Sequence, residues 1–245
     1  MKITQPLTVY LPDTRGVVIS RFGFGNLKIG PNVFTYSRLP GRSDRAALGG
    51  QSLVRGTCPG ATTECQAICY ASRPVQEGGP VFAMWEQNSI SDTAPRELPP
   101  DCRLLRIHVS GDFTSEGYID GWCRLLAAHP DVTAWAYTRS WRVPSLLPTL
   151  ERLRALPNVQ LFALMDVSTP ELPPAGWRRA WIFGDPRADV EPVGAVSAEG
   201  HANNYRTADG AHTYVCPEET GRKPHCETCG YCFGGQQHDV TFLRH

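Results

Sequence analysis

Residues 104–165, LLRIHVSGDFTSEGYIDGWCRLLAAHPDVTAWAYTRSWRVPSLLPTLERLRALPNVQLFALM, alternate short apolar runs with amphipathic stretches. The short runs have the length and composition of strands, and the longer stretches repeat apolar residues at the three-to-four spacing of helices. The strand-like runs are Leu104 to Val109, Val132 to Thr138 and Val159 to Met165. The helix-like stretches are Tyr118 to His129 and Ser145 to Leu156. This alternation predicts an α/β fold of parallel strands joined by crossover helices.

The same alternation extends outward in both directions. Further strands are expected at Val33 to Arg38 and Arg179 to Phe183, a further helix at Val81 to Asn88, and Tyr214 and Val215 continue the pattern. Five or six such units favour a partial (β/α) barrel over a doubly wound sheet. The expected organisation is a lead-in over 1–30, the partial barrel with a cysteine loop over 31–185, and a long loop with a cysteine-rich segment over 186–245.

Composition narrows the class of protein. Lysine plus arginine and aspartate plus glutamate each total 24, so no global charge attracts nucleic acid or an anionic membrane. The beginning of the chain has no apolar run of signal-peptide length, and nowhere do eighteen uncharged apolar residues follow one another, so we expect a cytoplasmic protein. In a reducing compartment, nine cysteines are better explained by metal or catalysis than by disulfides.

The C-terminal cysteine group carries the stronger metal signal. Two consecutive C-x2-C steps set three thiols on one tight loop, and a fourth cysteine is followed by proline, as bacterial ferredoxins present their clusters. Zinc is the competing metal, although its paired C-x2-C knuckles usually stand apart. The spacing therefore favours a [4Fe-4S] cluster. Its ligands would be Cys216, Cys226, Cys229 and Cys232.

The N-terminal group, Cys58, Cys65 and Cys69, has C-x6-C-x3-C spacing. Three protein sulfurs on a four-iron cluster would leave one iron open to a small molecule or cofactor. A histidine or Cys102 could instead supply a fourth ligand, and a zinc site completed by a distant residue is the alternative. We interpret Cys102 as structural and Cys123, on the apolar face of an expected helix, as a small buried hydrophobe.

Polar residues follow the expected strands, where barrel enzymes build their sites. They are Ser110, Gly111 and Asp112, then Thr138, Arg139 and Ser140, then Asp166, Ser168 and Thr169, then Asp185. Serine and aspartate are also ordinary turn residues, so their recurrence counts for more than any one of them. His108 could face a barrel interior with Arg106, although a satisfied buried histidine is the commoner case.

Arginine lies beside tryptophan at two places, Arg139 to Arg142 and Trp177 to Arg179. Such pairs can stack on bases or hold an anion, but they more often pack within the protein, so nucleic-acid contact is not favoured.

The stretches CPGATTECQAICYA, HVSGDF and AYTRSW resemble the phage-borne "gene product eighty-eight" proteins, over roughly residues 25 to 235. The cysteine loop after the first strand, the glycine-containing turn after the second and the C-terminal cysteines also resemble radical SAM enzymes. That resemblance implies a four-iron cluster whose open iron binds S-adenosylmethionine, with Ser110, Gly111 and Asp112 in the turn that contacts the cofactor. That family has C-x3-C-x2-C spacing and a glycine-glycine-glutamate turn, whereas this chain has C-x6-C-x3-C spacing and an SGD turn. Binding of S-adenosylmethionine therefore does not follow from the resemblance.

Three functions compete on this sequence. The favoured one is a redox enzyme with two [4Fe-4S] clusters, one open to a substrate or cofactor and the other relaying electrons from a donor protein or anchoring substrate. The second is an electron-transfer protein without catalysis. The third is a zinc-stabilised binding module. Iron predicts a brown protein, whereas zinc predicts a colourless one.

Overall fold

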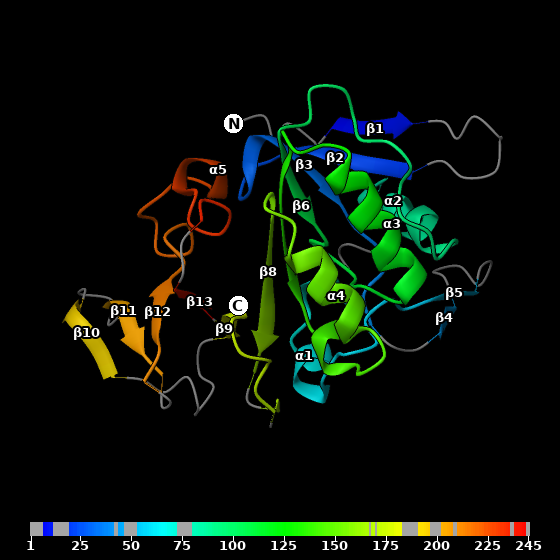
Figure 1. Cartoon of the computed structure of the whole chain (residues 1–245). Coiled ribbons are helices and arrows are strands. Elements are labelled where there is room, and N and C mark those ends of the chain that lie inside the picture. Colours follow the sequence, from blue (N-terminus) through cyan, green and yellow to red (C-terminus); the bar gives the residue numbers. More distant parts are fainter. Residues whose placement is uncertain are drawn as a thin grey trace.

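The computed structural model describes residues 7–11, 20–41, 44–46, 53–72, 80–166, 168–169, 171–182, 191–196, 202–207, 210–235 and 238–243. Eleven strands form one mixed sheet in the order β1-β2-β3-β6-β7-β8-β9-β13-β12-β11-β10, and β4 and β5 pair separately (Figure 1). The strands are β1 Leu7–Leu11, β2 Ser20–Asn26, β3 Gly30–Tyr36, β4 Asp44–Ala46, β5 Leu53–Arg55, β6 Leu104–Ile107, β7 Thr133–Thr138, β8 Val159–Met165, β9 Arg178–Ile182, β10 Glu191–Val196, β11 Ala202–Arg206, β12 His212–Val215 and β13 Asp239–Phe242. The helices are α1 Thr63–Ala67, α2 Pro80–Ser89, α3 Glu116–Ala127, α4 Leu147–Arg154 and α5 Cys226–Cys229, with short 3-10 turns η1 Tyr70–Ser72 and η3 Ser140–Arg142. The α/β class is confirmed.

The five strands β3, β6, β7, β8 and β9 are parallel and lie side by side in that order. Helix α3 connects β6 to β7, and α4 connects β7 to β8, as the βα alternation predicts. Strands β1 and β2 extend this sheet antiparallel at one edge. A sheet in which sequential strands advance in one direction places all their carboxyl ends along one edge, where the connecting loops gather.

The C-terminal part of the chain joins the same sheet. β13 lies between β9 and β12 and is parallel to both, while β10 and β11 continue antiparallel beyond β12. Strands β10 and β11 occupy part of 186–213, where small and polar residues predicted a long loop; that part of the prediction is wrong. This strand pair has only three strand-favouring residues, Val193, Val196 and Tyr205, which are too few to produce an alternating pattern.

Strand side chains alternate between two faces of the sheet. On β6 and β7, Leu105, Ile107 and Ala134 pack into the core beneath α3 and α4, whereas Leu104 and Trp135 face the cysteine-rich segment. Figure 1 shows α3 and α4 on one side of β6 and β8 and α5 on the other. The helix-covered face is therefore a conventional core, and the opposite face is covered by the cysteine-rich segment.

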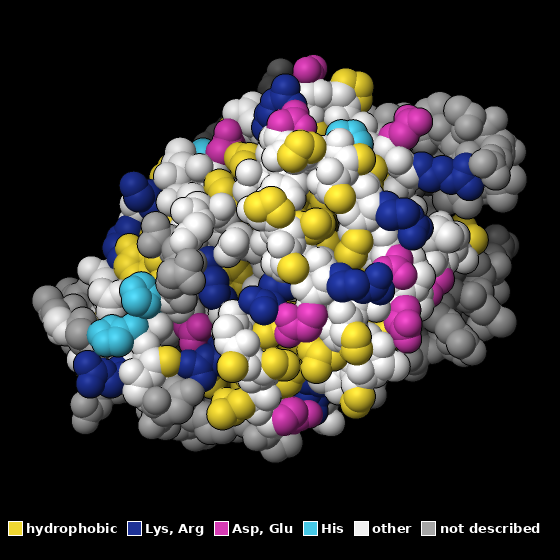
Figure 2. All heavy atoms as spheres, viewed as in Figure 1, with side chains coloured by type: hydrophobic (Ala, Val, Ile, Leu, Met, Phe, Trp, Pro, Cys, Tyr) yellow, Lys and Arg dark blue, Asp and Glu magenta, His cyan; other side chains and the backbone are white. Residues whose placement is uncertain are grey.

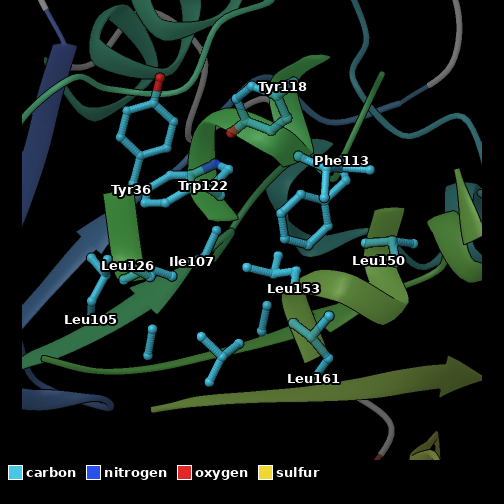
Figure 3. Close-up of a cluster of buried hydrophobic side chains, with 14 of the residues drawn as sticks. Tyr36, Leu105, Ile107, Phe113, Tyr118, Trp122, Leu126, Leu150, Leu153 and Leu161 are labelled. Atoms are coloured by element: carbon cyan, nitrogen blue, oxygen red, sulfur yellow. The ribbon is translucent and has the colours of Figure 1, made fainter. Parts of the chain in front are cut away.

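The helix-side core is aromatic at its centre (Figure 3). Trp122 of α3 is fully buried and meets Tyr36 of β3 edge to face at 5.3 Å between ring centroids. Leu150 and Leu153 of α4, also fully buried, close the other side. Cys102 packs into this core, and half-buried Cys123 packs against it, which agrees with their structural interpretation.

Local chemistry explains where the elements begin and end. Helix α3 begins two residues before the predicted Tyr118 because the Ser115 hydroxyl accepts a hydrogen bond from the Tyr118 N–H and caps the helix. Strand β6 ends at Ile107 and not at Val109 because His108 adopts a left-handed backbone with φ of 58°. The end of the strand predicted at Phe183 lies outside the described residues.

No helix in the described part of the chain is long and apolar enough to cross a membrane. On the face shown in Figure 2, lysine and arginine side chains are interspersed with aspartate and glutamate and do not gather into one basic patch.

Candidate metal centre

One cavity of about 580 Å³ lies against the face of the sheet opposite α3 and α4. All seven grouped cysteines line it, so the fold brings together two groups that are more than 140 residues apart in the chain. Strand side chains facing the cysteine-rich segment form part of its wall. They are Arg106, Trp135, Tyr137, Leu164 and Val240.

The first cysteine loop is fastened to the carboxyl ends of the strands. The Cys58 N–H donates to the Gly41 carbonyl at 2.8 Å, and the Arg142 guanidinium donates to the Gly60 carbonyl at 3.0 Å. The Thr62 hydroxyl accepts from the Cys65 N–H at 3.0 Å, capping α1, and donates to the Asp166 carboxylate at 2.6 Å. Cys65 is therefore held by a helix cap that is itself anchored at the end of β8.

A buried ion pair lies beside this loop. Arg139 and Asp166 are 2.7 Å apart, and their side chains are 2% and 1% exposed. Burial raises the pKa of the Cys65 thiol, and the Arg139 guanidinium opposes that shift. Burial also raises the pKa of Cys58 well above its usual range, and the neighbouring Asp112 carboxyl adds to it. These thiols therefore favour the neutral form, whereas a thiol that coordinates a metal ion is deprotonated.

The turn over Ser110, Gly111 and Asp112 contacts the same loop. Gly111 has a φ of 80°, and a Cβ at this position would lie 2.6 Å from the Thr57 hydroxyl oxygen, so the backbone approaches residue 57 as closely as glycine allows. Gly111 and Asp112 line the cavity. Asp112 is buried and its carboxylate accepts hydrogen bonds from the Thr138 hydroxyl at 2.5 Å and the Arg139 N–H at 2.8 Å.

Ser110 is buried beside this turn. Its carbonyl accepts from the Arg38 N–H at 2.9 Å, and its hydroxyl has no hydrogen-bond partner in the described structure. The structure thus places two of the three predicted cofactor-contact residues on the cavity wall, and their role stays a prediction.

The second group is positioned by both ends of the sheet. The Cys226 N–H donates to the Lys28 carbonyl at 3.1 Å, so α5 is hydrogen-bonded to the turn between β2 and β3. The Cys216 N–H donates to the Thr241 carbonyl of β13 at 2.9 Å. The Cys232 sulfur accepts a hydrogen bond from the Tyr137 hydroxyl at 2.8 Å.

Burial raises the pKa of both Cys216 and Cys232 to about 12. Gly230 ends α5 with a φ of 67°, which lets the chain turn tightly between the third and fourth cysteines. Within the described part of the chain, no group of three or more histidine, cysteine, aspartate or glutamate side chains is arranged to hold a metal ion. The cysteines therefore remain predicted ligands.

Arg106 and His108 both line the cavity and are hydrogen-bonded to each other. The Arg106 guanidinium lies 4.0 Å from the centre of the Tyr137 ring, and its Nη2 donates to the His108 carbonyl at 3.3 Å. The His108 Nε2 is 2.7 Å from the Tyr118 hydroxyl, and its Nδ1 is buried with no hydrogen-bond partner among the described residues. Burial, together with Arg38 and Arg106, lowers the pKa of His108 well below its usual value, so this histidine is neutral.

Sequence reasoning named Arg106 and His108 as residues that could face an interior, but it missed Trp135 and Tyr137. The alternation of strand side chains could have indicated them, because Trp135 and Tyr137 lie on the same face of the sheet as Arg106, opposite the helix-side core. Cys102 lies in the helix-side core, so it is not the fourth ligand of the first group. Thr138, Ser140 and Thr169 are buried near the strand ends, as expected, and Asp185 lies outside the described residues.

Side chains of the two arginine-tryptophan stretches are buried or form ion pairs within the protein. Trp141 and Trp177 are buried, at 4% and 6% exposure. Arg142 pairs with Glu171 at 2.8 Å, and Arg179 pairs with Asp239 at 2.6 Å. These two arginine side chains therefore have carboxylate partners within the protein.

Comparison with known proteins identifies the family. The family described as "Gene product 88" matches residues 42–235, and the chain belongs to it. The chain is 27% identical over 207 residues to the Gene 88 protein of Mycobacterium phage L5, covering 74% of this chain and 80% of that protein. It is 26% identical over 208 residues to the Gene 88 protein of Mycobacterium phage D29, with the same coverage. No solved structure matches the chain significantly.

Proposed function

We propose that the chain is a redox enzyme whose cavity holds two [4Fe-4S] clusters. The observation that carries this proposal is that both cysteine groups line one cavity, together with polar side chains from the sheet. Each cysteine that holds a four-iron cluster binds a different iron, so the cysteine sulfurs need not converge on one point. The ligands of a single zinc ion, in contrast, must all converge on that ion. When bound, such clusters would supply one-electron chemistry.

The first group supplies three thiols to the proposed cluster, which leaves an iron for a small molecule. Cys102, the cysteine that could have closed this site, is packed among helix-side core residues. The open position would face the cavity, because Cys58, Cys65 and Cys69 all line it. The chain's own contribution is to hold the three thiols on a loop that is fixed to β7 and β8 by Arg142 and Thr62.

The second group supplies four thiols, and one of them already accepts a hydrogen bond from Tyr137. A cluster held here would be fully ligated by protein and would pass electrons to or from the first site, or hold a substrate near it. An electron-donor protein would then be the natural partner.

We further propose that the parallel strands form a partial (β/α) barrel similar to that of radical SAM enzymes. The one-directional order of parallel strands β3 to β9 supports it, as does the SGD turn lying against the first cysteine loop. S-adenosylmethionine is accordingly the first small molecule to test at the open iron, with Ser110, Gly111 and Asp112 as the contacting turn.

The test is anaerobic purification of the full chain with iron, sulfide and zinc quantified, followed by EPR of the reduced protein with and without S-adenosylmethionine. About eight irons per chain and a spectrum that shifts on adding the cofactor would support two clusters, one of them open. Iron without a shift would remove S-adenosylmethionine from the proposal. Zinc alone would overturn the redox function in favour of a zinc-stabilised binding module.

Cysteine variants assign the iron to each group. Cys69→Ser is expected to lose about four irons and keep the signal of the second cluster, and Cys229→Ser is expected to do the reverse. Cys123→Ala is the matched control, because this cysteine packs against the helix-side core away from the cavity. Loss of all iron from either ligand variant would contradict two independent sites.

A further inference from the structure

Three cations line the cavity among the described residues, and two of them are neutralised by the protein. Lys28 pairs with Glu219 at 3.0 Å and Glu218 at 3.3 Å. Arg139 pairs with buried Asp166 at 2.7 Å. The third cation, Arg106, has no carboxylate partner among the residues that the structure describes.

One nitrogen of the Arg106 guanidinium is a hydrogen-bond donor without an acceptor among the described residues. Its Nη1 is buried and has no hydrogen-bond partner in the described structure, while Nη2 donates to a carbonyl. A guanidinium that is removed from water and left unpaired is unfavourable, so such groups usually meet an anion. The orphaned donor therefore indicates a ligand that the protein itself does not supply.

The Arg106 side chain is also fixed in place. Its guanidinium stacks on the Tyr137 ring at 4.0 Å, and the left-handed backbone of His108 presents the carbonyl that accepts Nη2. A non-glycine residue in this backbone region is uncommon and costs free energy, and such strain clusters at ligand sites. An arginine held this rigidly loses little freedom when it binds a planar anion.

Arg106 lines the same cavity as Cys69 of the first cysteine group and Cys226 of the second. A molecule held on Arg106 would therefore lie in the cavity that both cysteine groups line.

We propose that Arg106 binds the carboxylate of the molecule on which this site acts. The planar fork of a guanidinium matches a carboxylate with two parallel hydrogen bonds. A single positive charge without a carboxylate partner among the described residues suits a monoanion better than a doubly charged phosphate. The surrounding wall of Trp135, Leu164 and Val240 would accommodate an apolar remainder. The inference rests on the proposed function only in taking this cavity as the substrate site.

The test is isothermal titration calorimetry of the full chain with benzoate and with benzamide, which share shape but differ in charge. Benzoate is expected to bind about 10- to 100-fold more tightly than benzamide, and Arg106→Met is expected to abolish the difference. Arg103→Met is the matched control, because this exposed arginine just before β6 pairs with Asp131 away from the cavity. Equal binding of the two probes, or tighter binding of inorganic phosphate, would overturn the carboxylate assignment.

Metal analysis of each variant distinguishes a loss of benzoate binding from a loss of iron. If Arg106→Met loses iron, Arg106→Lys decides the question, because it keeps the charge but lacks the fork; benzoate should then bind about tenfold more weakly than to the unaltered chain. Undiminished benzoate binding in the lysine variant would contradict the proposal. Absence of iron from the unaltered chain would overturn the proposed clusters but leave the comparison of benzoate with benzamide interpretable.

Discussion

Gly60 lies two residues after Cys58 and presses directly on the end of β7. A Cβ added to Gly60 would stand 2.0 Å from the Arg139 carbonyl oxygen and 2.5 Å from the carbonyl carbon, both of them backbone atoms. Restoring an ordinary contact of 3.4 Å requires a displacement of about 1.4 Å, and no flexible side chain can absorb it. Gly60→Ala should therefore push the first cysteine loop away from the sheet.

The expected cost of Gly60→Ala is about 1–3 kcal/mol, the usual range for overpacking. For a chain of this size each kcal/mol lowers Tm by about 2–4 °C. Gly117→Ala is the control, because nothing lies within 4 Å of a Cβ at that helical position, and it should stabilise α3 by about 0.5–1 kcal/mol. Thermal unfolding followed by circular dichroism measures both, and iron analysis should show loss of the proposed first cluster in Gly60→Ala alone. A Gly60→Ala protein with unchanged Tm and full iron content would refute the reasoning.

Tyr137→Phe removes the hydrogen bond to the Cys232 sulfur. It should lower the midpoint potential of the proposed second cluster, because that bond favours the more negative reduced state, and an unchanged potential in a redox titration would contradict this. Burial raises the pKa of Asp92, but two neighbouring hydroxyls and the Arg38 guanidinium outweigh it and hold the pKa below its ordinary value. Asp92 therefore contributes stability at neutral pH that is lost as pH falls through that lowered pKa, and Asp92→Asn should show a smaller loss in acid unfolding, whereas an identical pH profile would argue against the linkage. Leu150→Ala empties a fully buried position under α4 and should cost about 2–5 kcal/mol in urea unfolding; a cost below about 1 kcal/mol would mean that the core collapses around the gap.

The central βα units could be predicted from sequence because local chemistry determines them. Strand β8 runs from Val159 to Met165 as expected, since its side chains alternate between two apolar environments and its length is bounded by polar residues. Boundaries shifted where one residue decided the geometry, as with the Ser115 cap and the left-handed His108. Neither is visible in a hydrophobic pattern.

The insertion of β13 between β9 and β12 was beyond sequence reasoning. Asp239–Phe242 is four residues long, and nothing in its composition says that it pairs with strands on both sides. Strand order depends on which edges are free when the chain returns, and short apolar runs carry no information about that. The partners of Arg142 and Arg179 were hidden for the same reason, because Glu171 and Asp239 lie far from them in the sequence.

The position of β13 also explains why the two cysteine groups share one cavity. Cys216 follows β12 and hydrogen-bonds to Thr241 of β13, which is itself paired to β9. Cys226 hydrogen-bonds to the turn before β3, at the other end of the parallel strands. The second group therefore spans the sheet face between these two attachments. Arg106 and Tyr137 line the same cavity, and they come from the parallel strands whose carboxyl ends hold the first group. Spacing within each cysteine motif predicts a metal, but only the sheet brings the two motifs to one site.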